Sequence, residues 1–282
     1  MNKIYILLPV YNRKEVTRRF IECLQQQTYA DYHLVLIDDG SQDGTAEMVR
    51  ERISSLTVIT GRGSWWWAGC LQQGLNWLKQ RRPNPDDIIL FMNDDVTFDT
   101  AFLQTAVVIL QKKIRTLLLP QICDSEFIPA QPIESGVEAD LKRLTFKTAS
   151  SPDRINCFPT RGLFARWSEV LSLGNFHSHM LPHYLSDYEF TIRAWKKRFH
   201  FYTTPELVIR VDDQTTGYHS FEEMRFFQFL KRFFSKKSAA NPIYWTTFVI
   251  LVSPKCWILP NIMRVWKNAA KTVLIRSFTA VY

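Results

Sequence analysis

Paired carboxylates follow two apolar segments of the sequence. Asp38 and Asp39 end the segment HLVLIDDGS, and Asp94 and Asp95 follow IILFMN. Carboxylate oxygens are the ligands that Mg²⁺ and Mn²⁺ prefer, and substrate phosphates commonly complete the coordination of these ions. A cation held in this way neutralises charge on a departing diphosphate. The two pairs predict a phosphate-handling cation site, whereas either pair alone would fit an ordinary solvated turn.

A further acid opens the amphipathic segment SDYEFTIRAWKKRF, which has the periodicity of a helix. Asp187 lies in its first turn, where the helix dipole keeps a carboxylate ionised. An ionised carboxylate can take the proton from an attacking hydroxyl group. Asp187 is therefore a candidate general base, and a helix-capping role for it is an alternative that is compatible with catalysis.

Alternating strands and helices are expected to bring these acids together. Strands are predicted at 3–11, 33–41, 56–61 and 86–96, and helices at 13–27, 43–53 and 68–82. This alternation indicates an α/β fold with a mostly parallel sheet and helices on both faces. In such sheets ligands bind outside the carboxyl ends of the strands, which is where the acid pairs lie. Later segments predict a helix at 99–113, a strand at 116–122, a helix at 186–199, and strand, turn and strand over 199–213.

Four motifs in register carry a family resemblance over about residues 3–220. LPVYNRKE, IDDGSQDGT, FMNDDV and SDYEFTIRAWKKR resemble, in order and spacing, the motifs of inverting glycosyltransferases of family 2. The resemblance implies the GT-A fold, a Rossmann-like architecture with a mostly parallel central sheet. It also implies a nucleotide-sugar donor, with dTDP or UDP as the expected nucleotide, and Mg²⁺ or Mn²⁺ as the cofactor.

The resemblance assigns roles to individual residues. Asp187 matches the general base, with Ser186 in place of the customary glutamate, and Asp95 matches the metal ligand. Asn93 replaces the first acid of the Asp-x-Asp motif, which predicts a ribose hydrogen bond or a water-mediated metal contact. His219 is a possible further metal ligand, with a structural histidine as the alternative. The residues expected around the donor are Pro9, Val10, Tyr11, Asn12, Asp39, Gly63, Ser64, Trp66, Trp67, Asn93 and Asp94.

Residues near the predicted base are expected to support the site. Glu189 and Arg193 either hold a loop or contact the acceptor. His183 belongs to NFHSHMLPHY, whose three histidines are spaced too unevenly to converge readily on zinc. Acceptor contact or a plain surface loop is the expected role of His183.

Three consecutive tryptophans occupy the segment GRGSWWWAG. Small residues let backbone amides approach phosphate, and an indole ring offers a sugar its flat apolar face. Within the family, Trp-Trp-x-Gly resembles bacterial rhamnosyltransferase-like enzymes of cell-surface polysaccharide assembly. We expect Trp66 or Trp67 to lie near the donor and Trp65 to pack, with core packing as the alternative for the whole group.

The last part of the chain carries the whole excess of positive charge. Residues 221–282 contain ten Lys and Arg against two Asp and Glu, which equals the net charge of +8 of the full sequence. Basic aromatic segments at 226–237 and 267–278 flank the apolar run 243–260, which Pro254 and Lys255 interrupt. This pattern predicts a glycosyltransferase domain at 1–220 and a tail of interfacial helices on an anionic membrane at 221–282. A helical cap or subunit interface is the main alternative, and a membrane span is disfavoured by the interruption.

The remaining composition bears on location and on rival functions. Five scattered cysteines and an N-terminus without a signal-peptide pattern predict a cytoplasmic protein on the inner face of the bacterial membrane. The neutral front part argues against nucleic-acid binding. The sequence thus predicts sugar transfer to a polyprenyl-linked glycan. A sugar nucleotidylyltransferase would have a glycine-rich phosphate loop that LPVYNRKE lacks, and a non-catalytic carbohydrate-binding subunit need not keep Asp95 and Asp187.

Overall fold

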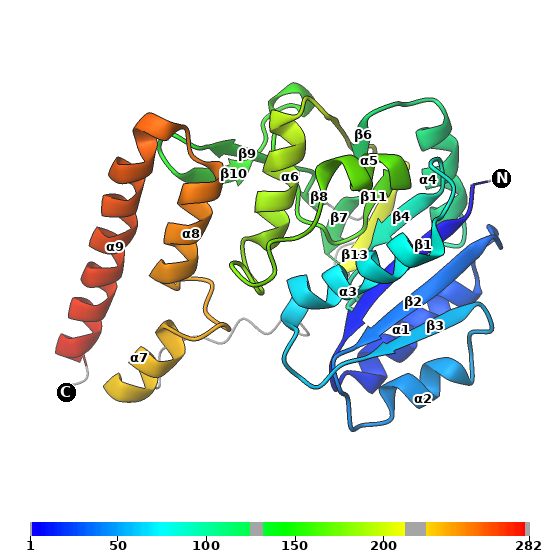
Figure 1. The fold of residues 1–282 in the computed structure, drawn as a ribbon, viewed down its shortest axis with the longest axis horizontal. Coiled ribbons are helices and arrows are strands. Elements are labelled where there is room, and N and C mark those ends of the chain that lie inside the picture. The colour runs from blue at the N-terminus through cyan, green and yellow to red at the C-terminus, as the bar shows by residue number, and fades with distance from the viewer. Residues whose placement is uncertain (1, 125–131, 212–223, 280–282) are drawn as a thin grey trace.

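The computed structural model describes residues 2–124, 132–211 and 224–279 (Figure 1). A central sheet of seven strands runs in the order β12-β6-β11-β4-β1-β2-β3. Their bounds are His200–Tyr202 (β12), Thr116–Leu118 (β6), Leu163–Arg166 (β11), Ile88–Phe91 (β4), Ile4–Val10 (β1), Tyr32–Asp38 (β2) and Leu56–Thr60 (β3). Only β11 is antiparallel to its neighbours β4 and β6. The predicted mostly parallel sheet is confirmed.

Alternate side chains of the sheet enter two hydrophobic cores. In β1, Ile6 and Leu8 join one core and Leu7 joins the other, because successive side chains point to opposite faces of a strand. The first core is covered by α1 (Lys14–Gln25), α2 (Thr45–Arg50) and α4 (Phe102–Gln111). The second is covered by α3 (Trp66–Arg81), α5 (Trp167–Leu173) and α6 (Ser186–Lys196). Burial on both faces explains why these strands are continuous apolar runs.

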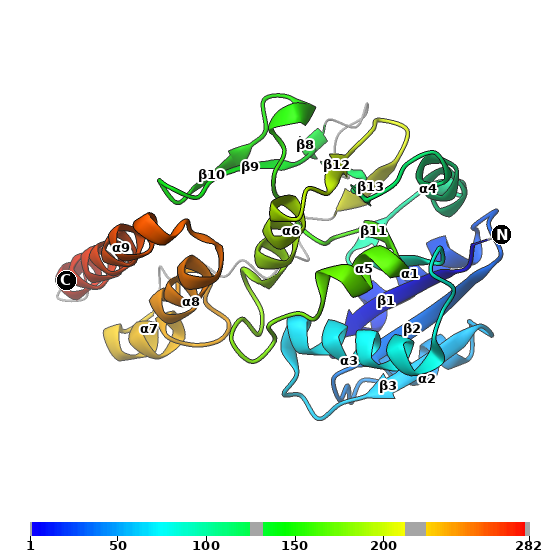
Figure 2. The same ribbon diagram turned by 45° about the horizontal axis from the view of Figure 1, so that its top comes forward.

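Two smaller sheets extend the central one. A four-stranded sheet has the order β5-β13-β7-β8, with β5 (Val96–Thr97), β13 (Val208–Val211), β7 (Gln121–Asp124) and β8 (Pro132–Glu134). The hairpin of β9 (Val137–Asp140) and β10 (Thr145–Thr148) reaches toward the C-terminal helices (Figure 2).

One predicted strand is wrong in this region. Residues 116–122 form not one strand but β6 and β7, which belong to different sheets. Pro120 lies between them, and proline removes a donor from the ladder, so the chain changes sheet there.

The C-terminal helices lie at one end of the molecule, beyond α6 (Figure 1). They are α7 (Phe226–Phe233), α8 (Pro242–Val252) and α9 (Ile258–Thr279). The predicted interruption at Pro254 is confirmed, since it falls between α8 and α9. Phe248 and Val252 of α8 pack with Leu185 and Ile192, so this helix shares a core with the rest of the protein. None of the described helices is both long and apolar enough to cross a membrane. The predicted domain boundary at 220 lies outside the described residues.

Candidate active site

The loops that follow β1 and β2 are joined at the carboxyl edge of the sheet. The Asn12 amide donates to Ser41 Oγ at 2.9 Å, and Asn12 Oδ1 accepts from the Gln42 amide at 2.8 Å. Pro9 and Val10 end β1 beside β2 and so fix where this junction lies. These hydrogen bonds therefore hold the two loops in one arrangement at this edge of the sheet.

Tyr11 offers an open aromatic ring at this junction. It is 53% exposed, and a Cβ placed on Gly63 would lie 3.7 Å from its ring. Gly63 has a φ of +77°, a left-handed conformation that glycine adopts without strain. The ring is available to stack on a flat ligand, as the sequence predicts for the nucleotide.

Asp39 holds the loop that contains the tryptophans. Its Oδ1 accepts from the amides of Gly63 and Ser64 at 2.9 and 3.1 Å. Its Oδ2 accepts from the amides of Trp65 and Trp66 at 2.9 and 3.1 Å. A carboxylate offers about four lone-pair positions, so these amides occupy the buried group fully. Asp39 holds the loop in this structure, and its predicted place beside the donor stays a prediction.

Trp65 packs, as expected, and it explains two glycines. A Cβ on Gly61 would come within 2.7 Å of the Trp65 ring, and one on Gly69 would lie 3.1 Å from the Trp65 Cβ. Trp65 contacts the second hydrophobic core. The glycines thus make room for an indole, and a phosphate approach is not needed to account for them.

Trp66 and Trp67 point in different directions. Trp67 packs edge-on against Phe176 in the core, with ring centroids 5.9 Å apart, and its Nε1 donates to Asn93 Oδ1 at 3.3 Å. Trp66 begins α3 with a φ of +59° and lies edge-on to His183 at 5.9 Å. Trp67 is therefore a link between the loop and Asn93, while Trp66 faces the side of α6.

Two arginines surround the acid pair after β4. The Arg13 Nε lies 3.0 Å from Asp94, which also accepts from the Thr17 hydroxyl at 2.8 Å. Burial raises the pKa of Asp94, and Arg13 and Thr17 oppose that shift. Asp95 lies 3.6 Å from Arg13 and 3.8 Å from Arg161. The chain's own cations thus compensate both carboxylates.

Asp95 fits a divalent cation better than Asp94 does. Its side chain is only 8% exposed, yet its Oδ1 is buried without a hydrogen-bond partner among the described residues. An unpaired buried oxygen is costly unless a ligand satisfies it. No group of three or more His, Cys, Asp or Glu able to hold a metal occurs within the described ranges. Among the described residues, Asp95 would hold a cation here together with substrate phosphates. His219 lies outside the described residues, so its predicted role as a metal ligand stays a prediction.

Asp187 is the second residue of α6, and Leu185, which precedes the helix, has a φ of +68°. Burial of its carboxyl group raises the pKa to about 6, while the Tyr188 amide, which donates at 2.8 Å, and the charge of Arg161 oppose the rise. A carboxyl with such a pKa is ionised at neutral pH and still basic enough to accept a proton. This geometry suits the predicted general base.

Arg161 connects the predicted base with the predicted metal ligand, and the sequence reading missed it. Its guanidinium lies 3.8 Å from Asp95, and its charge acts on Asp187. It precedes Gly162, whose φ is +84°, at the entry to β11. Arginine next to glycine before a strand was the available signal, but the sequence predictions include no strand at the position of β11.

Glu189 and Arg193 hold a loop. Arg193 donates to both carboxylate oxygens of Glu189, at 3.0 and 2.8 Å, and to the carbonyl of Leu173 at 2.7 Å. Of the two predicted roles for this pair, loop support is what the structure displays, because these contacts occupy the buried Glu189.

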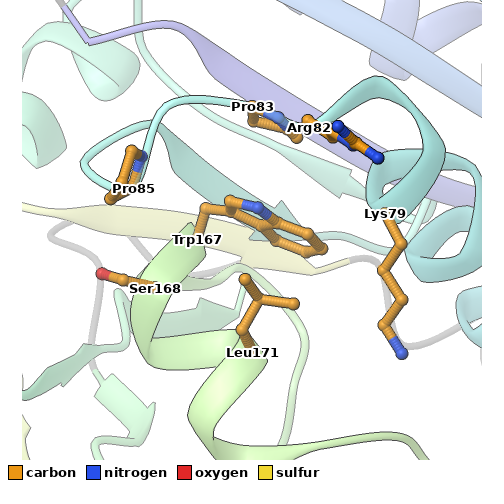
Figure 3. A pocket seen from close by; sticks show the side chains of 7 residues that line it. All are labelled: Lys79, Arg82, Pro83, Pro85, Trp167, Ser168 and Leu171. Carbon is orange, nitrogen blue, oxygen red and sulfur yellow. The ribbon is translucent and has the colours of Figure 1, made fainter.

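A cavity of about 320 Å³ lies away from these residues (Figure 3). It is lined by Trp167 and Leu171 of α5 and by Lys79, Arg82 and two prolines around the end of α3. None of the predicted site residues lines it. The candidate active site therefore lies not in this cavity but at the carboxyl edge of the sheet.

Comparisons with known proteins identify a family for the first part of the chain. Residues 5–125 match the family described as Glycosyl transferase family 2. Glycosyltransferase AglE of Haloferax volcanii is 36% identical over 50 residues, 17% of this chain and 16% of that protein. Undecaprenyl-phosphate 4-deoxy-4-formamido-L-arabinose transferase of Proteus mirabilis is 38% identical over 56 residues, 18% of this chain and 17% of that protein. The chain thus matches only about a sixth of the length of either relative.

Solved structures share the fold over a larger part of the chain. Mannosyltransferase PcManGT from Pyrobaculum calidifontis, in complex with GDP-Man and Mn²⁺, has a TM-score of 0.58 at 17% identity, covering 99% of this chain and 80% of that one. GalNAc-T7 with UDP, GalNAc and Mn²⁺ has a TM-score of 0.65 at 12% identity, covering 87% and 48%. At these identities the likeness establishes the fold, and it agrees with the predicted GT-A architecture. Over residues 5–125 this chain thus matches glycosyl transferase family 2, and the shared fold agrees with that match.

Proposed function

We propose that this chain is an inverting glycosyltransferase that moves a sugar from a nucleotide-diphosphate donor to a lipid-linked glycan. One observation carries the proposal: Asp95 and Asp187 both interact with Arg161 at the carboxyl edge of the sheet. A carboxylate with an unpaired oxygen suits the cation side of the reaction. A carboxylate whose pKa is about 6 suits the proton-accepting side.

The donor would bind over the loops after β1 and β3. Tyr11 would stack on the base, and Pro9, Val10 and Asn12 would shape the ribose side. A bound Mg²⁺ or Mn²⁺, held by Asp95 and donor phosphates, would neutralise the leaving diphosphate. Arg13 and Arg161 would add fixed positive charge on the same side, since both lie within 4 Å of Asp95.

The acceptor would react on the side of α6. Its hydroxyl oxygen attacks the anomeric carbon while its proton passes to Asp187. The new carbon–oxygen bond forms on the face opposite the bond to the diphosphate, and the nucleoside diphosphate leaves with both electrons of that bond. The configuration at the anomeric carbon is inverted. One carboxylate is enough for this displacement, and no covalent intermediate is required.

The identities of donor, metal and acceptor are proposed from the relatives. One solved relative holds UDP and another GDP-Man, each with Mn²⁺, and a sequence relative is named for undecaprenyl phosphate. We propose a dTDP- or UDP-sugar, Mg²⁺ or Mn²⁺, and a polyprenyl-linked glycan of bacterial surface polysaccharide. A rhamnosyltransferase-like donor is the narrower proposal that the Trp-Trp-x-Gly segment supports.

The C-terminal helices would attach the enzyme to the cytoplasmic face of the membrane. Exposed large apolar side chains concentrate on α8 and α9, namely Ile243, Ile250, Leu259, Met263, Trp266, Leu274 and Ile275. The same region carries the positive charge that an anionic bilayer attracts. Such attachment would bring a lipid-linked acceptor to an otherwise ordinary GT-A site.

Ligand-dependent stabilisation followed by product analysis tests the proposal. Thermal unfolding should shift upward with UDP or dTDP in the presence of Mn²⁺, and less with CMP or GDP. Incubation of the matching nucleotide sugar with a polyprenyl-diphosphate-linked glycan should release nucleoside diphosphate and give a product of inverted anomeric configuration by NMR. A retained configuration would contradict the mechanism. Nucleotide binding without any transfer to such acceptors would favour the carbohydrate-binding alternative.

A further inference from the structure

The segment that joins α7 to α8 meets the tryptophan loop. Lys236 Nζ and Lys237 Nζ each lie 5.9 Å from the centroid of the Trp66 ring. The N-terminal end of α3, where Trp66 lies, is directed toward this segment in both views (Figures 1 and 2). The positively charged part of the chain is thus in contact with the candidate active site.

The two lysines leave positive charge without a matching carboxylate. Both residues are exposed, and no ion pair joins either ammonium to a carboxylate within residues 2–124, 132–211 and 224–279. Two neighbouring ammonium groups repel each other, and one indole face compensates them only weakly. An anion placed between them would relieve that repulsion.

His183 adds a polar atom to the same place. Its ring lies edge-on to Trp66 at 5.9 Å, and its Nδ1 is buried without a hydrogen-bond partner among the described residues. Burial and the charge of Lys237 lower the pKa of His183, so the imidazole is neutral at neutral pH. A neutral imidazole can donate one hydrogen bond to an anionic oxygen.

His183 links the tryptophan loop to the start of α6, where the predicted base lies. The Trp66 amide is fixed to Asp39, and the His183 carbonyl accepts from the hydroxyl of Ser186, the residue before Asp187. A molecule that delivers a hydroxyl group to Asp187 must pass the start of α6. The unpaired charge of the two lysines therefore lies beside Trp66 and His183, near the start of α6, whereas Arg13 and Arg161 are the cations that contact Asp95.

We propose that Lys236 and Lys237, together with Trp66 and His183, form a subsite for the phosphate or diphosphate group of the lipid-linked acceptor. Ammonium groups bind phosphate as compact charges, and the indole lines the apolar side of the entrance. This inference rests on the proposed function, because it takes the acceptor to be a lipid phosphate. It gives the basic tail a role inside the site in addition to any role on the membrane.

Farnesyl diphosphate, a soluble probe, tests the subsite by calorimetric titration of the full chain. Farnesol, which lacks the phosphates, should not bind measurably. In the double variant Lys236→Gln/Lys237→Gln, the affinity for farnesyl diphosphate should fall by about tenfold or more, because two charge-assisted contacts are lost. The matched control Lys267→Gln/Lys271→Gln removes the same charge from exposed positions on α9 and should leave this affinity unchanged.

Three outcomes would overturn the subsite. An equal loss in both double variants would indicate a general charge effect. A loss of binding only to phosphatidylglycerol vesicles, with farnesyl diphosphate binding intact, would assign the lysines to lipid headgroups. A loss of UDP binding would assign them to the donor. The titration measures binding and needs no sugar transfer, so it separates the subsite from the proposed function. If the wild-type chain transfers sugar and the lysine variant binds farnesyl diphosphate normally, the subsite alone is refuted. If farnesyl diphosphate binding depends on the lysines but no sugar is transferred, the proposed reaction alone is refuted.

Discussion

The acid pairs after β2 and β4 have the same residue types and nearly the same place, but different partners. Asp39 is saturated by four backbone amides, which stay in place as long as the loop keeps its fold. Asp95 lies near two arginine side chains and keeps one oxygen unpaired. Side-chain cations can move when a ligand arrives, and backbone amides cannot without unfolding the loop. The first pair therefore builds the site, and the second is available for chemistry.

Asp187 should give the largest effect, because it combines a chemical role with an unfavourable environment. Replacement by Asn removes the proton acceptor, so kcat should fall by about 10²–10⁴-fold. The pKa of Asp187 in the folded chain is about 6 against an ordinary 3.8, so ionisation costs stability as pH rises between those values and at all higher pH. Asp187→Asn should therefore raise the free energy of unfolding at pH 7.5 by about 1–3 kcal/mol. Steady-state kinetics and urea denaturation measure the two effects.

A fully active Asp187→Asn enzyme would rule out the general base. An inactive variant that is also less stable would indicate that Asp187 supports the fold, as a simple helix cap would.

Asp95→Asn and Asp94→Asn test whether the two acids after β4 differ as their contacts suggest. Asp95→Asn should lower kcat/KM by about 10²-fold and weaken Mn²⁺ binding, because a carboxylate ligand to the cation is lost. Its effect on stability should be small. Asp94→Asn should leave Mn²⁺ binding nearly unchanged and mainly weaken the contact of this side chain with Arg13. Electron paramagnetic resonance of Mn²⁺ with UDP measures the binding, and unchanged Mn²⁺ binding in Asp95→Asn would argue against Asp95 as a ligand.

Asp39→Asn should act on the loop. The amide group that replaces one oxygen would face two backbone N–H groups, leaving them unpaired at a cost of about 2–4 kcal/mol in total. The KM for the donor should rise by about tenfold, with a smaller change in kcat. Asp38→Asn is the matched control, because within the described residues the Asp38 carboxylate accepts from a single backbone amide, that of Ser41. Equal destabilisation by the two variants would remove the distinction between these acids.

The sequence could predict those features of the acids that depend on neighbouring residues along the chain. Continuous apolar runs predicted the strands and so the positions of Asp39 and Asp95, and helical periodicity placed Asp187 at the start of α6. The four amides on Asp39 depend on the backbone of a loop that turns at Gly63 and Trp66, both with positive φ. A positive φ at tryptophan has no local sequence signal. Loop packing alone decided it.

Contacts between distant segments were the larger omission. Arg161 reaches Asp95 because β11 inserts antiparallel between β4 and β6, and that insertion depends on the whole sheet. Lys236 reaches Trp66 because α8 packs on α6. The residues of a segment do not show which distant partner they contact, so only the assembled fold reveals that these cations reach the site.

The smallest predicted effect concerns the pH dependence that Arg161 imposes on Asp187. The acid limb of kcat/KM should lie near pH 6 in the unaltered chain, because Asp187 must be ionised to accept a proton. Arg161 lowers the pKa of Asp187, so Arg161→Gln should move this limb to higher pH, by about half a unit for a partly screened charge. Arg161→Lys keeps the charge and should restore most of the position of the limb, even if the diphosphate contact remains weakened. A lower rate at every pH, with the limb unmoved, would mean that Arg161 acts only on the side of Asp95. Arg161 would then act beside Asp95 alone and would not connect Asp95 with Asp187.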